Sequence, residues 1–286
     1  MPTPLEYDTA YHTKRHTAEH ESAAHGAASV DAIDSESELA ILVDLATTEA
    51  SLSGVWKRFL SDGAIRTDLT DAVLDRILNA IETPPDRALP LARPRALDEY
   101  TFTHAINVGV LSAAVADAAG LASNDLQDLA VAAFFHDIGQ CAVPEDILAK
   151  SGRLDDDERA HVAIHPAFGA GILQQQSALP PIASIVAYEH HIRGDGLGYP
   201  FHRKPWRTHL ASQIVQLADI FDALRTERPY RAAHDTDHAL GVLDTLAGAA
   251  FDREIFHAFR DHVVPRLAVE GADAESDDRR DSSEAA

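Results

Sequence analysis

Apolar residues recur along this chain at helical spacing, and no alternating strand pattern of useful length interrupts them. The clearest repeats are Val73, Leu74, Ile77, Leu78 and Ile81, and later Ile214, Leu217, Ala218, Phe221 and Leu224. Steps of three and four residues place side chains on one face of a helix. The pattern therefore predicts an all-α fold.

Residues that start and stop helices divide the central region into segments. Asp98 can cap a helix that ends at Gly120, and Ser123 can cap the next helix, which we expect to end at Gly139. Pro166 forces a break and can begin a new helical turn. Two further helical segments are expected at 157–165 and 182–191.

Periodicity and composition divide the chain into four parts. Residues 1–35 are polar, rich in His, Ala, Ser and Glu, and lack a sustained period, which predicts a disordered tail. We expect residues 36–94 to form N-terminal helices that pack on the core. Residues 95–270 are expected to form the main domain, and residues 271–286 a disordered acidic tail.

Composition limits the chemistry that this domain can perform. Cys141 is the only cysteine, so an internal disulfide and a thiolate zinc cluster are excluded and a metal would need nitrogen and oxygen ligands. The net charge of −22 argues against nucleic-acid polymers as partners. A small anionic substrate stays open, because it would meet the local charge of a metal centre.

Membrane insertion and export are not expected. The longest apolar stretches fall short of the roughly 20 residues that a membrane span requires. No signal-peptide pattern opens the chain. We therefore expect a cytoplasmic location.

An adjacent His136 and Asp137 follow an apolar run, and further His and Asp residues lie in other apolar segments. These are His104, His165, His190, His191 and Asp219. A single buried His is usually a hydrogen-bonded core residue, whereas several that converge favour metal ligation. A carboxylate can bridge two cations while neutral imidazoles fill the remaining positions, and Asp137 is the natural bridge.

Such a site would suit phosphate chemistry. Two divalent ions with two ligand carboxylates leave net positive charge, which attracts phosphate and lowers the pKa of a shared water. The set therefore favours hydrolysis of a phosphoester. Ligation rich in His favours iron, manganese, cobalt, nickel or zinc over magnesium and calcium, which prefer oxygen.

Eight motifs in fixed order resemble the HD-GYP branch of the HD-domain phosphohydrolases. They are HAINV at 104–108, HDIG at 136–139, KSGRL at 150–154, HP at 165–166, HH at 190–191, DGLGYP at 195–200, ADIFDAL at 218–224 and RPYR at 228–231. The resemblance covers roughly residues 95–235. It implies an all-α HD-domain bundle, a centre of two or three metal ions, often iron or manganese, and hydrolysis of the bacterial second messenger cyclic di-GMP.

The resemblance also assigns roles to residues. It implies one ion held by His104, His136, Asp137 and Asp219, and another held by Asp137, His165, His190 and His191. His136 and Asp137 would carry catalysis, with a hydroxide that bridges the ions attacking phosphorus in line. The substrate would be met by Gln140, Arg193, Asp195, Gly196 and Tyr199.

Several positions depart from the family's pattern. Gln140 stands where the family usually has Lys, and supplies a hydrogen bond without a charge. Ile192 replaces the Glu after the His doublet, Gly194 replaces an aromatic or polar residue, and Gln213 stands where Arg is common. Tyr100 occupies the place of the acidic ligand found in members with three metals, so we predict two ions, with iron or manganese favoured.

These departures leave three hypotheses. The leading one is a metal-dependent phosphodiesterase that hydrolyses cyclic di-GMP or a related cyclic dinucleotide. The second is an HD-type hydrolase of another nucleotide or phosphoester. The third is a non-catalytic module that binds metal or nucleotide and signals through a partner. A homodimer formed through the N-terminal helices is also open.

Overall fold

The computed structural model of the chain is helical throughout most of the part that it describes, which confirms the predicted all-α fold. The described residues, all within the unit Leu39–Ala286, are 56, 60–61, 64–82, 88–89, 91, 100–203, 206–227 and 232–267. The predicted tails and the proposed cap Asp98 lie outside these residues. A short antiparallel hairpin, β1 (Leu60–Ser61) and β2 (Ala64–Ile65), was not predicted, because two-residue strands leave no periodic signal.

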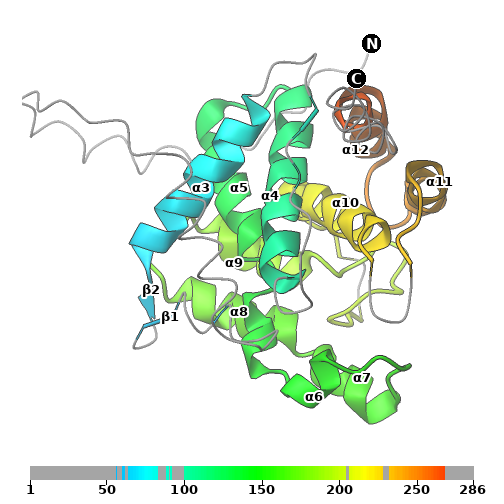
Figure 1. Cartoon of the computed structure of the whole chain (residues 1–286). Helices are drawn as coiled ribbons and strands as arrows, with labels where there is room; N and C mark the ends of the chain where they lie inside the picture. The colour runs from blue at the N-terminus through cyan, green and yellow to red at the C-terminus, as the bar shows by residue number, and fades with distance from the viewer. Residues whose placement is uncertain are drawn as a thin grey trace, which may run out of the picture. The chain divides into compact units, whose positions relative to one another are not determined.

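Figure 1 shows how the described helices are arranged. The α-helices are α3 (Thr67–Ile81), α4 (Tyr100–Ala118), α5 (Ser123–Phe134), α6 (Glu145–Leu148), α7 (Asp156–Val162), α8 (His165–Gln174), α9 (Ile182–Glu189), α10 (Leu210–Arg225), α11 (Thr236–Leu246) and α12 (Arg253–Ala258). Single turns of other helix types are η2 (Ile138–Ala142), η3 (Phe259–Val263) and η4 (Val264–Arg266). No helix among the described residues combines the length and apolar character needed to cross a bilayer.

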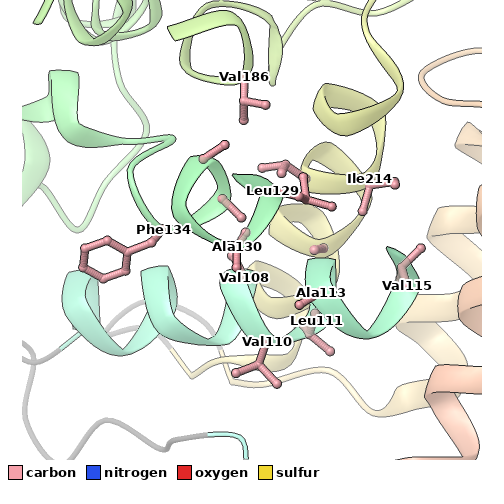
Figure 2. Packing of buried hydrophobic residues seen from close by; sticks show 14 of the residues in the cluster. Val108, Val110, Leu111, Ala113, Val115, Leu129, Ala130, Phe134, Val186 and Ile214 are labelled. Carbon is pink, nitrogen blue, oxygen red and sulfur yellow. The ribbon is translucent and has the colours of Figure 1, made fainter. Parts of the chain in front are cut away.

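Helix α4 forms the centre of the core. It packs against α3, α5 and α10, and every residue from Thr101 to Ala116 is buried. Figure 2 shows Val108 and Leu111 of α4 among side chains from α5, α9 and α10. Because α4 is surrounded by other helices, His104 near its start is enclosed within the protein.

The end of α4 agrees with the prediction, whereas the limits of α5 differ from it. Gly120 has a φ of +76°, the left-handed conformation that ends many helices. Helix α5 ends at Phe134 instead of Gly139, and Ser123 is its first residue, because the N-cap position is taken by Ala122. The chain leaves the helix because Gly139 lies against the backbone of α8, where an added Cβ would come 1.9 Å from the His165 carbonyl oxygen.

Helices α7 and α8 both begin at residues that favour a helix start. Asp155 and Glu158 form a reciprocal capping box at the start of α7. Pro166 stands in the first turn of α8, as predicted. His165 is therefore the first residue of a helix instead of the last residue of the one before it.

Candidate metal centre

The seven residues proposed as metal ligands converge from five parts of the fold. Nitrogen and oxygen atoms of Asp137, His165, His190 and His191 lie within 4.8 Å of one another, as do those of His104, His136 and Asp137. Asp219 on α10 joins the second group, because its Oδ1 lies 3.1 Å from His104 Nε2. Asp137 belongs to both groups, which is the geometry that a bridging carboxylate needs.

Helix ends allow several of these side chains to meet. His165 begins α8, and His190 is the C-cap residue of α9. His191 follows in a turn, so the two neighbouring rings can both face the cluster, with centroids 4.1 Å apart. Side chains from consecutive positions in the middle of a helix would diverge by about 100°.

Three of the imidazoles are oriented by their own backbone. Nδ1 of His136 lies 2.7 Å from the carbonyl oxygen of Ala133, and Nδ1 of His165 lies 2.8 Å from that of Val162. Nδ1 of His190 lies 2.9 Å from the carbonyl oxygen three residues earlier. A carbonyl only accepts, so Nδ1 carries the proton in each ring and Nε2 of a neutral ring presents a lone pair.

The lone pairs face one another inside the protein. Nε2 of His165 lies 3.2 Å from Nε2 of His190, and Oδ1 of Asp137 lies 3.1 Å from the former and 3.6 Å from the latter. Nε2 of His136 and Oδ1 of Asp137 are buried and make no hydrogen bond. Electron-pair donors at these distances repel one another unless positive charge lies between them. The donor set therefore fits metal cations.

Protonation in the cluster is consistent with metal ligation. Burial would raise the pKa of Asp137, but the neighbouring imidazoles, chiefly His136, hold that pKa well below its usual range. Burial also opposes ionisation of Asp219, and its neighbours, chiefly His104, lower its pKa. Both carboxyl groups are thus ionised at neutral pH. Burial, followed by the neighbouring imidazoles, lowers the pKa of His191 well below its usual range and keeps this ring neutral.

Asp222 is a functional residue that the sequence did not single out. Its Oδ2 lies 2.7 Å from His104 Nδ1, and its Oδ1 accepts a hydrogen bond from Asn107 Nδ2 at 2.9 Å. This places His104 between Asp222 and Asp219, with one ring nitrogen facing each carboxylate. A carboxylate behind a ligand imidazole fixes the ring and increases its basicity. The only sequence signal was an Asp three residues after Asp219 on the same helix.

Tyr100 lies on the other side of His104. The two rings are stacked, with centroids 5.6 Å apart and planes 7° apart. Tyr100 therefore presents an aromatic ring, and no carboxylate, to His104.

The residues predicted to bind substrate fall into two sets. The Gln140 amide donates a hydrogen bond to Asp137 Oδ2 at 2.5 Å, and the ring of Tyr199 lies 4.5 Å from that of His191. Both therefore border the cluster. Arg193 and Asp195 bond to each other in the loop after α9, where Gly196 adopts a φ of +77°.

The same loop folds back onto the His190–His191 doublet. The Tyr199 amide donates to the His191 carbonyl at 3.0 Å, and a Cβ at Gly198 would come 2.1 Å from that oxygen. A cavity of about 220 Å³ lies against the loop. Its walls include Arg193, Gly196 and Trp206.

Residues 87–255, more than half of the chain, match the protein family described as HD domain. The chain belongs to the HD-domain family. Relatives of this HD-domain chain are named as phosphodiesterases of cyclic dinucleotides, and they confirm the HD-GYP branch predicted from its motifs. The cluster of His and Asp residues, which could hold a metal ion, is consistent with membership of this family.

Two of these relatives show the extent of the similarity. A cyclic di-GMP phosphodiesterase of Pseudomonas aeruginosa is 33% identical over 196 residues, which is 68% of this chain and 47% of the relative. A 3'3'-cGAMP-specific phosphodiesterase of Vibrio cholerae is 36% identical over 192 residues, which is 67% of this chain and 40% of the relative. The HD-domain chain thus spans less than half the length of these curated relatives.

A solved structure supports the fold. An HDG"Y"P protein from Bdellovibrio bacteriovorus superposes with a TM-score of 0.54 at 16% identity, covering 79% of this chain and 76% of that one. At this level of identity, the comparison shows a shared HD-domain fold.

Proposed function

We propose that this chain is a metal-dependent phosphodiesterase that hydrolyses a cyclic dinucleotide, with cyclic di-GMP as the first candidate. The observation that carries the proposal is the pair of donor groups that share Asp137, with imidazole nitrogens turned inward by bonds to their own backbone. Relatives named as cyclic di-GMP and cGAMP phosphodiesterases support this substrate class. Hydrolysis would add water across one phosphodiester and open the ring to a linear dinucleotide.

Two divalent ions, iron or manganese, would occupy the centre. His104, His136, Asp137 and Asp219 would hold one ion, and Asp137, His165, His190 and His191 would hold the other. When bound, such ions would activate a water molecule and neutralise phosphate charge. Imidazole and carboxylate together suit these metals better than they suit calcium or magnesium.

The protein's own side chains would orient the reaction. Asp137, held at Oδ2 by Gln140, is kept ionised between the two groups. Gln140 and Tyr199 border the cluster and would contact the substrate there. Arg193, Asp195 and Gly196 would shape the adjoining loop, because their mutual contacts fix its turn.

Hydrolysis by the full chain, purified without oxygen and supplied with Mn²⁺ or Fe²⁺, tests the proposal. Cyclic di-GMP, 3'3'-cGAMP and bis(p-nitrophenyl) phosphate are offered separately, and linear products are measured. We expect cleavage of at least one cyclic dinucleotide, and a loss of at least about 1,000-fold in Asp137→Ala because both ligand groups lose their shared carboxylate. Asp117→Asn, an exposed carboxylate outside the cluster, is the matched control and should retain activity.

The other outcomes separate the alternatives. Cleavage of bis(p-nitrophenyl) phosphate without cleavage of either dinucleotide would assign the chain to other phosphoesters, a result that the uncharged Gln140 would favour. If a cyclic dinucleotide binds but is not cleaved with either metal, this result would contradict the proposed enzymatic activity. It would instead support a non-catalytic module that binds the nucleotide.

A further inference from the structure

Glu189, the residue directly before the His doublet, is a buried carboxylate that gathers three hydrogen-bond donors. Its Oε1 accepts from Trp206 Nε1 at 2.9 Å. Its Oε2 accepts from the His209 backbone amide at 2.7 Å and from Ser212 Oγ at 2.8 Å. The residue is 6% exposed, so water does not replace these partners.

The three donors come from a different part of the chain than Glu189. Trp206 lies in the segment before α10, His209 is the N-cap residue of that helix, and Ser212 stands in its first turn. Glu189 itself is the last residue of α9. One carboxylate therefore joins the end of the helix that presents His190 and His191 to the start of the helix that carries Asp219.

Glu189 adjoins the candidate metal centre on one side and the cavity beside the loop after α9 on the other. His190 follows it directly and lies 3.6 Å from Asp137 Oδ1 through Nε2. On the other side, Trp206 borders the cavity beside the loop at 193–200. The start of α10 is also fixed locally, because His209 Nδ1 accepts a hydrogen bond from the Ala211 amide at 3.1 Å.

We propose that Glu189 is a positioning residue, which fixes the His190–His191 doublet relative to α10 and so sets the geometry of the metal ligands. This inference rests on the proposed function, because it gives the doublet the role of metal ligand. An ionised carboxylate only accepts hydrogen bonds, so it satisfies all three donors at once. A glutamine side chain has the same size but only one oxygen that can accept. Its NH₂ group would face at least one of the three donors and could not accept a hydrogen bond from it.

Metal binding by the full chain, measured without substrate, tests the role. Glu189→Gln keeps the size of the side chain and removes the double acceptor. We expect Mn²⁺ affinity to fall about 10- to 100-fold, the usual effect of losing a residue that orients metal ligands. Elemental analysis should show bound metal falling from about two ions per chain to about one, while the circular dichroism spectrum stays helical.

Two further readouts distinguish positioning from general stability. Trp56 and Trp206 are the only tryptophans, and Trp56 is fully buried, so a shift in emission on Glu189→Gln would report release of the Trp206 indole. With bis(p-nitrophenyl) phosphate, kcat should fall and KM should stay within about twofold. The exposed Glu254→Gln on α12 is the matched control and should leave metal binding unchanged.

Each outcome decides the proposal. A folded Glu189→Gln that binds two ions with wild-type affinity would overturn it. If this variant does not fold, Trp206→Phe combined with Ser212→Ala removes two donors without removing the charge. That double variant should lower Mn²⁺ affinity several-fold, and unchanged affinity would overturn the inference. If the wild type binds two ions and cleaves nothing, the proposed function fails while the role of Glu189 is still decided by metal binding.

Discussion

At the scale of single residues, the histidines of the centre are oriented in two different ways. His136, His165 and His190 each use a carbonyl three residues earlier, which is available because each residue lies in a turn or at a helix end. His104 stands within α4, where the backbone carbonyls already serve the helix. A distant carboxylate, Asp222, therefore has to orient this ring.

Replacing Asp222 should weaken one ion selectively. In Asp222→Asn the residue behind His104 loses its charge, so affinity at the His104–Asp219 side should fall about 10- to 100-fold. The side formed by His165, His190 and His191 should retain its ion. Metal content by elemental analysis checks this, with the exposed Asp244→Asn as control. Two ions bound with wild-type affinity would show that Asp222 does not orient the ligand.

Gln140 offers a test of substrate choice at the residue scale. Its amide lies on Asp137 Oδ2, beside the place where a phosphate would bind. Gln140→Lys adds a charge, and a charged hydrogen bond is stronger than a neutral one by about 1 kcal/mol, so KM for cyclic di-GMP should fall about fivefold. Gln140→Met, which removes the bond without adding charge, is the comparison. An unchanged or higher KM in the lysine variant would count against contact with phosphate.

At the scale of elements, close backbone approaches bring the proposed ligand residues together. Gly139 in η2 lies against α8, and Gly198 in the loop after α9 lies against His191. In both cases the nearest atom to an added Cβ is a carbonyl oxygen of a proposed ligand residue. These two glycines therefore determine how near η2 and the loop can come to α8 and the doublet.

Alanine at Gly139 should displace α8. The added Cβ would lie 1.9 Å from the His165 carbonyl oxygen, and backbone atoms cannot rotate away as a side chain can. We expect the free energy of unfolding to fall by about 2 kcal/mol or more, with loss of bound metal. At Gly171 in α8 an added Cβ meets no atom within 4 Å, so Gly171→Ala should instead raise the free energy of unfolding by about 0.5–1 kcal/mol. Urea unfolding checks both, and a neutral Gly139→Ala would refute the packing argument.

At the scale of the whole molecule, the buried donors should couple folding to metal binding. Lone pairs of His165, His190 and Asp137 face one another in the interior, where only positive charge relieves their repulsion. The overall charge of −22 adds a general attraction for cations. An ion that binds the folded chain but not the unfolded chain therefore stabilises the fold.

Removal of metal should lower the melting temperature. An ion present at 100 times its Kd stabilises the fold by about 2.7 kcal/mol, which corresponds to about 5–10 °C for a domain of this size. Calorimetry of the full chain with EDTA, and again after Mn²⁺ is restored, measures the shift. Asp137→Ala should show little difference between the two conditions. If EDTA leaves the melting temperature of the metal-loaded wild type unchanged, a stabilising ion would be excluded.

The sequence predicted what local patterns encode and missed what distant contacts decide. Helical periodicity predicted α3 and α10, and ordered His and Asp motifs predicted a cluster that the structure brings together. The end of α5 was wrong because Gly139 is fixed by contact with α8 instead of by helix capping. Asp222 and Glu189 escaped notice because their partners lie 17 or more residues away.

The burial of α4 indicates where substitutions should disturb this molecule most. Every side chain from Thr101 to Ala116 touches the interior, so a substitution on any face of the helix disturbs packing or the residues that orient His104. The loop after α9 has the opposite character, since Leu197 and Phe201 are 78% and 76% exposed. The fold should therefore tolerate substitutions at these exposed loop positions better than substitutions in the central helix.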